Sequence, residues 1–129
     1  MRRELAQGKQ VTLANGTVID PEEVLALPDR GKKLVIIGDA EATEGLAEQV
    51  RDADVLVIEA TFLERDVSIA RDYGHLTAAE AAELAATSDV KQLVLTHISG
   101  RYSDEEIVAE AAKAFPNSRI AMDFDRLVI

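Results

Sequence analysis

Two histidines and a few carboxylates are the residues of this chain best suited to chemistry. The chain has only two histidines, His75 and His97, and no cysteine. His97 follows the apolar run Leu93–Thr96, which is typical of a strand, and a polar turn containing Arg101 comes after it. In open α/β sheets, ligands gather beyond the carboxyl ends of the strands. A histidine at that place is positioned to be a metal ligand or an acid–base group.

Carboxylates follow two other strand-like runs. Asp39 comes after residues 34–37, and Glu59 comes after residues 55–58. The carboxyl ends of parallel strands lie at one edge of a sheet, so we predict that Asp39 and His97 converge despite their distance in sequence. A carboxylate oxygen and a neutral imidazole are both good zinc ligands. Because the chain has no cysteine, any metal must be held by histidine and carboxylate.

Each of these residues also has a purely structural explanation. Asp39 could cap a turn or the following helix, and His97 could be a hydrogen-bonded structural histidine. His75 could be a loop residue without a role, and Arg101 could form either a surface salt bridge or an anion clamp for phosphate. An unpaired buried carboxylate is costly, so Glu59 is expected to have a partner and could orient one of the histidines.

Alternating strands and helices are expected to position these residues. This alternation implies an α/β fold with a mostly parallel sheet. Two capping boxes, Thr77–Glu80 and Ser103–Glu106, each mark the start of a helix. The other expected elements are helices at about 43–51 and 64–73, a helix that ends at Thr87, a helix that ends before Pro116, and strands at 34–37, 55–58, 93–96, 119–122 and 127–129.

The N-terminal part of the chain has a different pattern. Apolar residues alternate over 11–19 around Asn15-Gly16, a dipeptide typical of a two-residue hairpin turn. Pro21-Glu22-Glu23 predicts a short helical turn, and residues 28–33 predict a polar connection. Residues 1–9 are expected to be either disordered or part of a helix that is missing from the chain.

Composition limits the classes of function. The chain has 129 residues, 47% of them apolar and 29% charged, so we expect one domain over residues 1–129. Its net charge of −10 argues against unaided binding of nucleic acid, because lysine and arginine supply much of that affinity. No apolar run is long enough to span a membrane, no export signal is visible and no disulfide can form. A cytoplasmic location is therefore expected.

Four motifs follow one another along the chain: Gly38-Asp39, Glu59-Ala60-Thr61-Phe62, Gly74-His75-Leu76-Thr77-Ala78-Ala79-Glu80-Ala81-Ala82 and Leu95-Thr96-His97-Ile98-Ser99-Gly100-Arg101-Tyr102. In this order and spacing they resemble the C-terminal half of ribonuclease Z, the tRNA 3′-processing endonuclease family of the metallo-β-lactamase superfamily, and the ending Phe115–Phe124 also fits. The likeness runs from about residue 10 to the end of the chain. It implies half of an αββα sandwich, with a mostly parallel sheet, helices and an N-terminal β-hairpin.

The resemblance implies a role for each candidate residue. Asp39 matches the carboxylate that bridges two zinc ions, and His97 matches the last histidine ligand of one of them. His75 matches the histidine beside the scissile phosphate, which assists the leaving group. Glu59 matches a carboxylate that we place behind the ligands as an orienting group. Arg101 matches an arginine that could contact phosphate. Two zinc ions would activate water and neutralise the phosphate.

The chain also departs from the family pattern. Ala40 replaces the usual Thr after the bridging Asp, and Leu76 stands where the family has Ser or Thr. Thr77, in the same motif, is expected to contact substrate. The family's His-x-His-x-Asp-His motif is absent, as is a further histidine, and these residues supply most of the zinc ligands. We therefore expect an incomplete zinc site and a chain that is inactive alone.

Three hypotheses follow. In the first, the chain is the C-terminal part of a zinc-dependent phosphodiesterase and needs a missing N-terminal half or a second copy of itself; a tRNA precursor is the substrate by resemblance only. In the second, it is a non-catalytic module for dimerisation or partner binding that retains the half-fold. In the third, it is a receiver-like domain with Asp39 as phosphoacceptor. That hypothesis is disfavoured because no lysine stands at a strand end.

Overall fold

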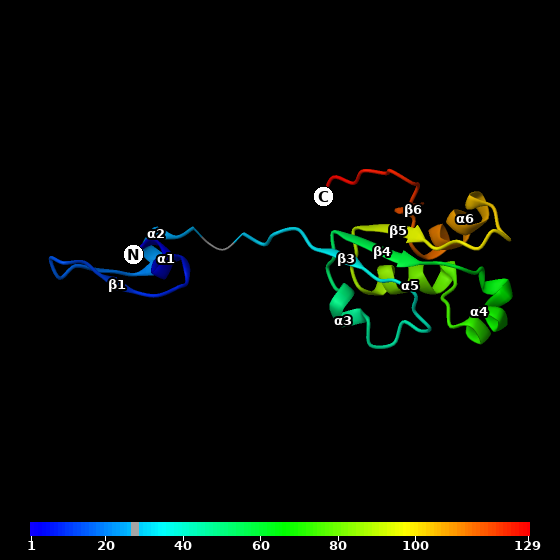
Figure 1. Ribbon diagram of the computed structural model, residues 1–129, viewed down its shortest axis with the longest axis horizontal. Helices are drawn as coiled ribbons and strands as arrows, with labels where there is room; N and C mark the ends of the chain where they lie inside the picture. Colours follow the sequence, from blue (N-terminus) through cyan, green and yellow to red (C-terminus); the bar gives the residue numbers. More distant parts are fainter. Residues whose placement is uncertain (27–28) are drawn as a thin grey trace. The chain divides into compact units, whose positions relative to one another are not determined.

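The chain is divided by its own contacts into two compact units, Met1–Gly31 and Lys32–Ile129. The structure is a computed structural model that describes residues 1–26 and 29–129 (Figure 1). The expectation of one domain over residues 1–129 stays a prediction.

The first unit contains the expected hairpin and two short helices. The strands are antiparallel, and their last pair is Thr12 with Val18. The loop between them is longer than the predicted two-residue turn: the Leu13 amide donates to the Thr17 carbonyl (2.8 Å), and Gly16 has a φ of 83°. The predicted connection at 28–33 lies partly outside the described residues. The elements are α1 (Arg2–Ala6), β1 (Val11–Thr12), β2 (Val18–Ile19) and α2 (Pro21–Val24).

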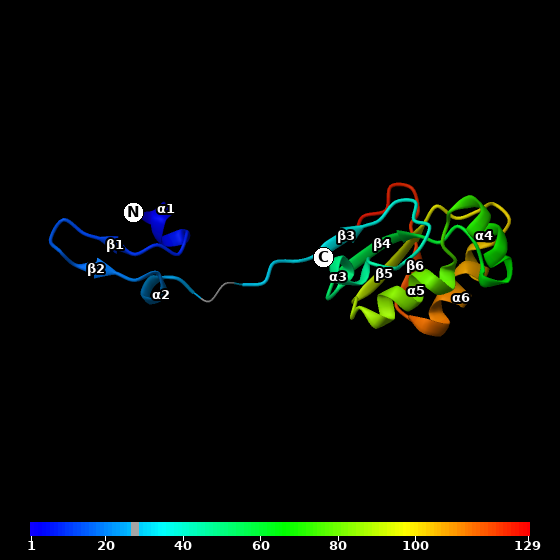
Figure 2. The same cartoon turned by 90° about the horizontal axis from the view of Figure 1, so that it is seen from below.

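The second unit is built on a four-stranded parallel sheet with the strand order β3-β4-β5-β6 (Figure 2). Every neighbouring pair of strands is parallel, which confirms the fold class expected from the sequence. The strands are β3 (Leu34–Ile36), β4 (Val55–Glu59), β5 (Gln92–Thr96) and β6 (Ser118–Ile120).

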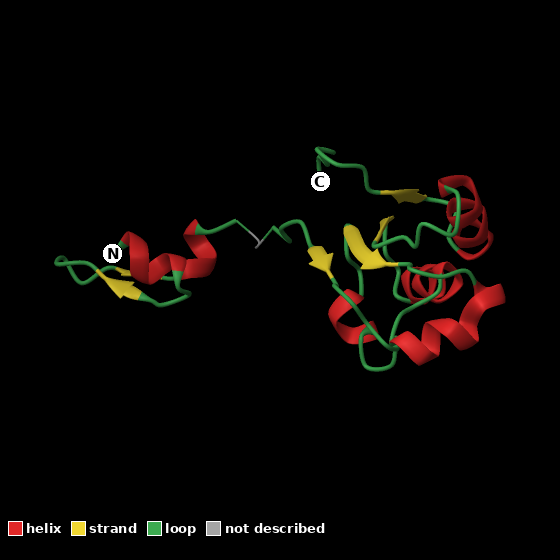
Figure 3. Ribbon diagram, turned by 45° about the vertical axis from the view of Figure 1, so that its right-hand side comes forward, coloured by secondary structure: helices red, strands yellow, loops and turns green. Residues whose placement is uncertain are grey.

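Two helices of this unit begin where the capping residues predict. Thr77 and Ser103 each accept a hydrogen bond from the amide three residues later, and both capping boxes are complete. No helix among the described residues is long and apolar enough to cross a membrane. The helices, red in Figure 3, are α3 (Ala47–Val50), the 3-10 helix η1 (Glu64–Asp66), α4 (Val67–Tyr73), α5 (Ala78–Thr87) and α6 (Asp104–Ala114).

Two predictions of secondary structure were wrong, one in the extent of a helix and one in the existence of a strand. The helix predicted at about 43–51 is only Ala47–Val50, because Gly45 has a φ of 80°, which no right-handed helix accommodates. The strand predicted at 127–129 pairs with no described strand, and Val128 is 97% exposed.

The core lies on one face of the sheet. Leu56, Ile58, Leu93 and Leu95 are fully buried and belong to one apolar cluster with the inner residues of α5 and α6. On the opposite face the apolar residues of β3 lack cover: Leu34 is 47% exposed and Ile36 is 69% exposed. The edge strand therefore presents an apolar surface.

Candidate functional site

Strand ends from across the sheet meet at one edge. Asp39 follows β3, Glu59 is the last residue of β4 and His97 follows β5. The parallel register brings Asp39 Oδ1 to 3.7 Å from His97 Nδ1, the convergence expected from the topology. His75, which precedes α5, joins them, and its ring centroid lies 5.0 Å from that of His97.

Glu59 is the buried centre of this group. Its side chain is 1% exposed. The carboxylate accepts hydrogen bonds from the Ala40 amide (2.8 Å), the Thr61 hydroxyl (2.6 Å) and the Leu76 amide (3.2 Å). Burial raises the pKa of Glu59, but hydrogen bonds from Thr61, Ala40, His75 and Leu76 outweigh it and hold this pKa below its ordinary value. Glu59 is therefore an anion at neutral pH.

The same carboxylate fixes the proton positions of both histidines. His75 Nδ1 lies 2.9 Å from Glu59 Oε1, so Nδ1 carries a proton and donates it. His97 Nδ1 lies 2.9 Å from the Thr61 hydroxyl oxygen. Because that hydroxyl gives its only proton to Glu59, His97 Nδ1 must be the donor in this contact. Both rings thus leave Nε2 available for a ligand or a transferable proton.

Backbone turns at two left-handed residues deliver the histidines to this place. Gly74 ends α4 with a φ of 70°, and His97 itself has a φ of 55° where the chain leaves β5. Histidine tolerates this region better than β-branched residues do. The Ser99 amide then donates to the Thr61 carbonyl at 3.1 Å, which ties the His97 loop to the end of β4.

A metal ion fits the donor chemistry of this group. Asp39, His75 and His97 each offer one ligand atom, and these atoms lie within 4.8 Å of one another. Two imidazoles and a carboxylate are zinc-type ligands, and each histidine has its other nitrogen hydrogen-bonded, as metal-binding histidines usually do.

Arg101 and Thr77 lie in contrasting surroundings. Arg101 is exposed, with its guanidinium 5.8 Å from the Phe62 ring centroid and no carboxylate partner among the described residues. It is thus available to an anion. Thr77 is fully buried, and its hydroxyl lies 3.1 Å from carboxylate oxygens of Glu64 and of Glu80. Its assignment to substrate binding stays a prediction, and these hydrogen bonds give it a structural role.

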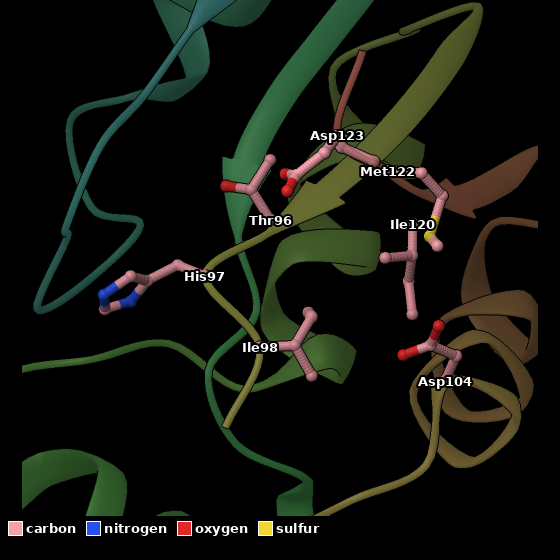
Figure 4. A pocket seen from close by; sticks show the side chains of 8 residues that line it. Thr96, His97, Ile98, Asp104, Ile120, Met122 and Asp123 are labelled. Carbon is pink, nitrogen blue, oxygen red and sulfur yellow. The ribbon is translucent and has the colours of Figure 1, made fainter. Parts of the chain in front are cut away.

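Sequence reasoning missed the role of Thr61 and the hollow beyond His97. Thr61 could have been found from the Glu-x-Thr spacing at a strand end, which lets a hydroxyl reach back to the carboxylate. The hollow, of about 660 Å³, adjoins the loop after β5 (Figure 4). Two carboxylates in its wall make it unsuited to phosphate. It is lined by Thr96, His97, Ile98, Asp104, Ile120, Ala121, Met122 and Asp123.

Comparison with known proteins agrees with this geometry. The family described as "Beta-lactamase superfamily domain" matches residues 3–98. Ribonuclease Z of Bradyrhizobium diazoefficiens is 67% identical over all of this chain and 43% of its own length. Ribonuclease Z of Geobacillus kaustophilus is 46% identical over 95% of this chain and 41% of its own length. The chain thus spans less than half the length of these curated relatives.

Solved structures show the same fold. The short form of human tRNase Z is 29% identical and superposes with a TM-score of 0.58, covering 84% of this chain and 35% of its own. The metallo-β-lactamase fold protein YhfI of Bacillus subtilis, at 23% identity and a TM-score of 0.62, covers 68% of this chain and 36% of its own. The chain therefore belongs to the β-lactamase superfamily, and its sequence corresponds to the C-terminal part of ribonuclease Z.

Proposed function

We propose that this chain supplies one part of the active site of a zinc-dependent phosphodiesterase that cleaves tRNA precursors near their 3′ ends. The observation that carries the proposal is the joint anchoring of two histidines on Glu59, directly or through Thr61, beside Asp39. The likeness to ribonuclease Z over the full chain supports the substrate class.

Asp39 and His97 would hold the metal. When bound, zinc supplies charge neutralisation at the phosphate and acidifies water. The described residues offer too few ligands for two ions, so further donors must come from a partner, either the N-terminal part of a ribonuclease Z or a second copy of this chain.

His75 would act as the acid. Glu59 accepts the Nδ1 proton of His75 and so orients the ring, and a proton on Nε2 would pass to the departing ribose oxygen. Arg101, exposed and without a carboxylate partner among the described residues, would contact the phosphate. The net charge of −10 means that most of the affinity for RNA must come from the partner.

Zinc binding is the first test. Equilibrium dialysis of the purified chain, alone and mixed with the N-terminal part of a ribonuclease Z, should give a higher zinc stoichiometry in the mixture. His97→Asn should lower that stoichiometry, because asparagine tolerates the left-handed backbone but removes the imidazole. Asp104→Asn, at the hollow, is the matched control and should bind as the unmodified chain does.

Cleavage of a tRNA precursor by the mixture is the second test. The proposal expects 3′ processing by the mixture, and a large loss of rate with His75→Asn in a mixture that still folds. A mixture that assembles and binds zinc, yet does not cleave, contradicts the proposed activity.

A second candidate function rests on the bare face of β3. Leu34 and Ile36 are apolar and exposed, which favours a non-catalytic module for dimerisation or partner binding. Under this hypothesis the chain self-associates or binds its partner with Leu34 and Ile36 buried, and neither zinc nor His75 matters. Sedimentation of a Leu34→Gln/Ile36→Thr double variant distinguishes it, because weakened association without any recoverable cleavage favours the module.

A further inference from the structure

One side chain accepts hydrogen bonds from both ends of the segment that carries His75. Glu110, on α6, accepts hydrogen bonds from the backbone amide of Glu64 through both carboxylate oxygens, at 3.0 and 3.1 Å. Its Oε2 also accepts from the backbone amide of Ala79 at 3.1 Å. Glu110, which is distant in sequence, is therefore hydrogen-bonded to the first and the last residue of the segment Glu64–Ala79.

A carboxylate is the side chain that this position requires. Glu64 is the first residue of η1, and Ala79 is the second residue of α5, so both amides belong to helix starts that have no acceptor within their own helix. The partial positive charge of each helix start favours an anion. A glutamine has a single acceptor oxygen and could not serve all three contacts.

The segment between these two contacts holds His75 against Glu59. The His75 amide donates to the Ala70 carbonyl at 2.9 Å, and the Leu76 amide donates to Glu59 at 3.2 Å. Helix α6 begins immediately after the loop that starts with His97. Helix α6 is therefore connected to both histidines: it follows the His97 loop in the chain, and its Glu110 is hydrogen-bonded to the segment that carries His75.

Other contacts between α6 and this segment are weaker or local. Arg65 pairs with Glu106 at 3.0 Å, but both side chains are exposed, and exposed ion pairs contribute little to stability. The Tyr102 hydroxyl, just before α6, donates to Asp66. Both contacts hold the first turns of the segment and neither reaches α5.

We propose that Glu110 is a positioning residue for His75, acting through the backbone at both ends of Glu64–Ala79. The value of that position for catalysis rests on the proposed function, but the positioning itself does not require metal or substrate. It can therefore be tested on this chain alone, and its failure is separable from a failure of zinc binding or cleavage.

The test measures amide hydrogen exchange and ring contacts by NMR in Glu110→Gln. Exchange at His75 and Leu76 should accelerate roughly tenfold or more, because a charge-assisted hydrogen bond is lost. Amides of β4 and β5 should change by less than about twofold. The nuclear Overhauser contact between the rings of His75 and His97, whose centroids lie 5.0 Å apart, should weaken.

Two further variants keep the inference falsifiable. Glu110→Asp keeps the charge but is one methylene shorter, so it should reproduce the local loosening if glutamine proves poorly folded. Glu106→Ala removes the Arg65 pair and the side-chain acceptor of the Ser103 amide without touching either amide that is bonded to Glu110, so it should lower stability and leave the ring contact intact. Unchanged exchange at Leu76 in both Glu110 variants, or an equal increase throughout β4 and β5, would overturn the proposal.

Discussion

Two buried carboxylates stand at opposite ends of β4 and have opposite surroundings. Asp54, just before the strand, pairs with Lys91 at 2.7 Å and accepts from the Lys33 amide at 2.8 Å. Glu59, the last residue of the strand, has no lysine or arginine partner among the described residues and is held by amides, a hydroxyl and His75.

The difference separates a structural carboxylate from one that serves a site. The charge of Asp54 is matched permanently by a lysine, so the group holds the amino end of the sheet together. Glu59 has no such partner among the described residues, and its negative charge is held by hydrogen bonds alone, with His75 Nδ1 as one of the donors. Strand β4 thus has a carboxylate paired with a lysine near its first residue, and at its last residue a carboxylate without a lysine or arginine partner among the described residues.

Glu59→Gln should produce the largest effect. An amide has one acceptor oxygen, and its NH2 would face donors, so several buried hydrogen bonds are lost and the free energy of unfolding should fall by about 2–4 kcal/mol. Urea denaturation measures this change. Glu105→Gln, on the exposed side of α6, removes the same charge and should stay within about 0.5 kcal/mol. A loss below about 1 kcal/mol would contradict the central role of Glu59.

Asp54→Asn should remove part of the acid dependence of stability. The Lys91 ammonium and the Lys33 amide lower the pKa of Asp54 from 3.8 to about 2. A lowered folded-state pKa gives stability that is complete above the unfolded pKa and is lost as pH falls through the folded one. The unmodified chain should thus lose Tm between about pH 4 and pH 2. Asp54→Asn should have a lower Tm at neutral pH and a smaller fall in Tm on acidification. The control variant Asp72→Asn should show the same fall in Tm on acidification as the unmodified chain.

Thr61→Val should affect only one of the two histidines. The nearly isosteric change removes the hydroxyl between His97 and Glu59, at a cost of about 1–2 kcal/mol. Nitrogen-15 shifts of the rings should show that His97 loses its Nδ1–H preference, whereas His75 retains it. Thr96→Val, next to His97, is the control. Equal changes in both rings would mean that Thr61 supports the site as a whole and is not a specific link.

Lys91→Gln should have the smallest effect on stability. The lysine side chain is 66% exposed, and Asp54 keeps the hydrogen bond from the Lys33 amide. Thermal unfolding should show a smaller drop in Tm than Asp54→Asn causes. In high salt this drop should be smaller still, because salt screens the lysine charge. A larger drop than that of Asp54→Asn would mean that Lys91 contributes through packing of its aliphatic stem.

Local signals predicted the parts of the fold that depend on local chemistry. The capping residues Thr77 and Ser103 and the apolar runs of β4 and β5 are where the sequence places them, because propensity and pattern agree there. The helix at 43–51 was overestimated because a glycine inside it adopts a left-handed backbone, and sequence alone does not show the sign of φ.

The topology of the sheet predicted which strand ends meet at the site, but not which hydrogen bonds form there. Parallel strands bring Asp39 and His97 to one edge whatever their side chains do, so their convergence could be derived. Which histidine contacts Glu59 directly could not be derived, since it depends on the path of the loop between α4 and α5. The contacts of Glu110 depend on how α6 packs across two helix starts, and no local pattern records this.

The bare strand β3 makes this chain a candidate for self-association through its edge. Edge strands with apolar faces offer unpaired amides and carbonyls to another chain, and native proteins protect them by keeping them short or by placing lysine beside them. Both devices are present: β3 has only 3 residues, and Lys32 and Lys33 precede it. Because this protection is partly electrostatic, added salt should bring identical chains together at β3, and concentrated preparations should be kept at low ionic strength.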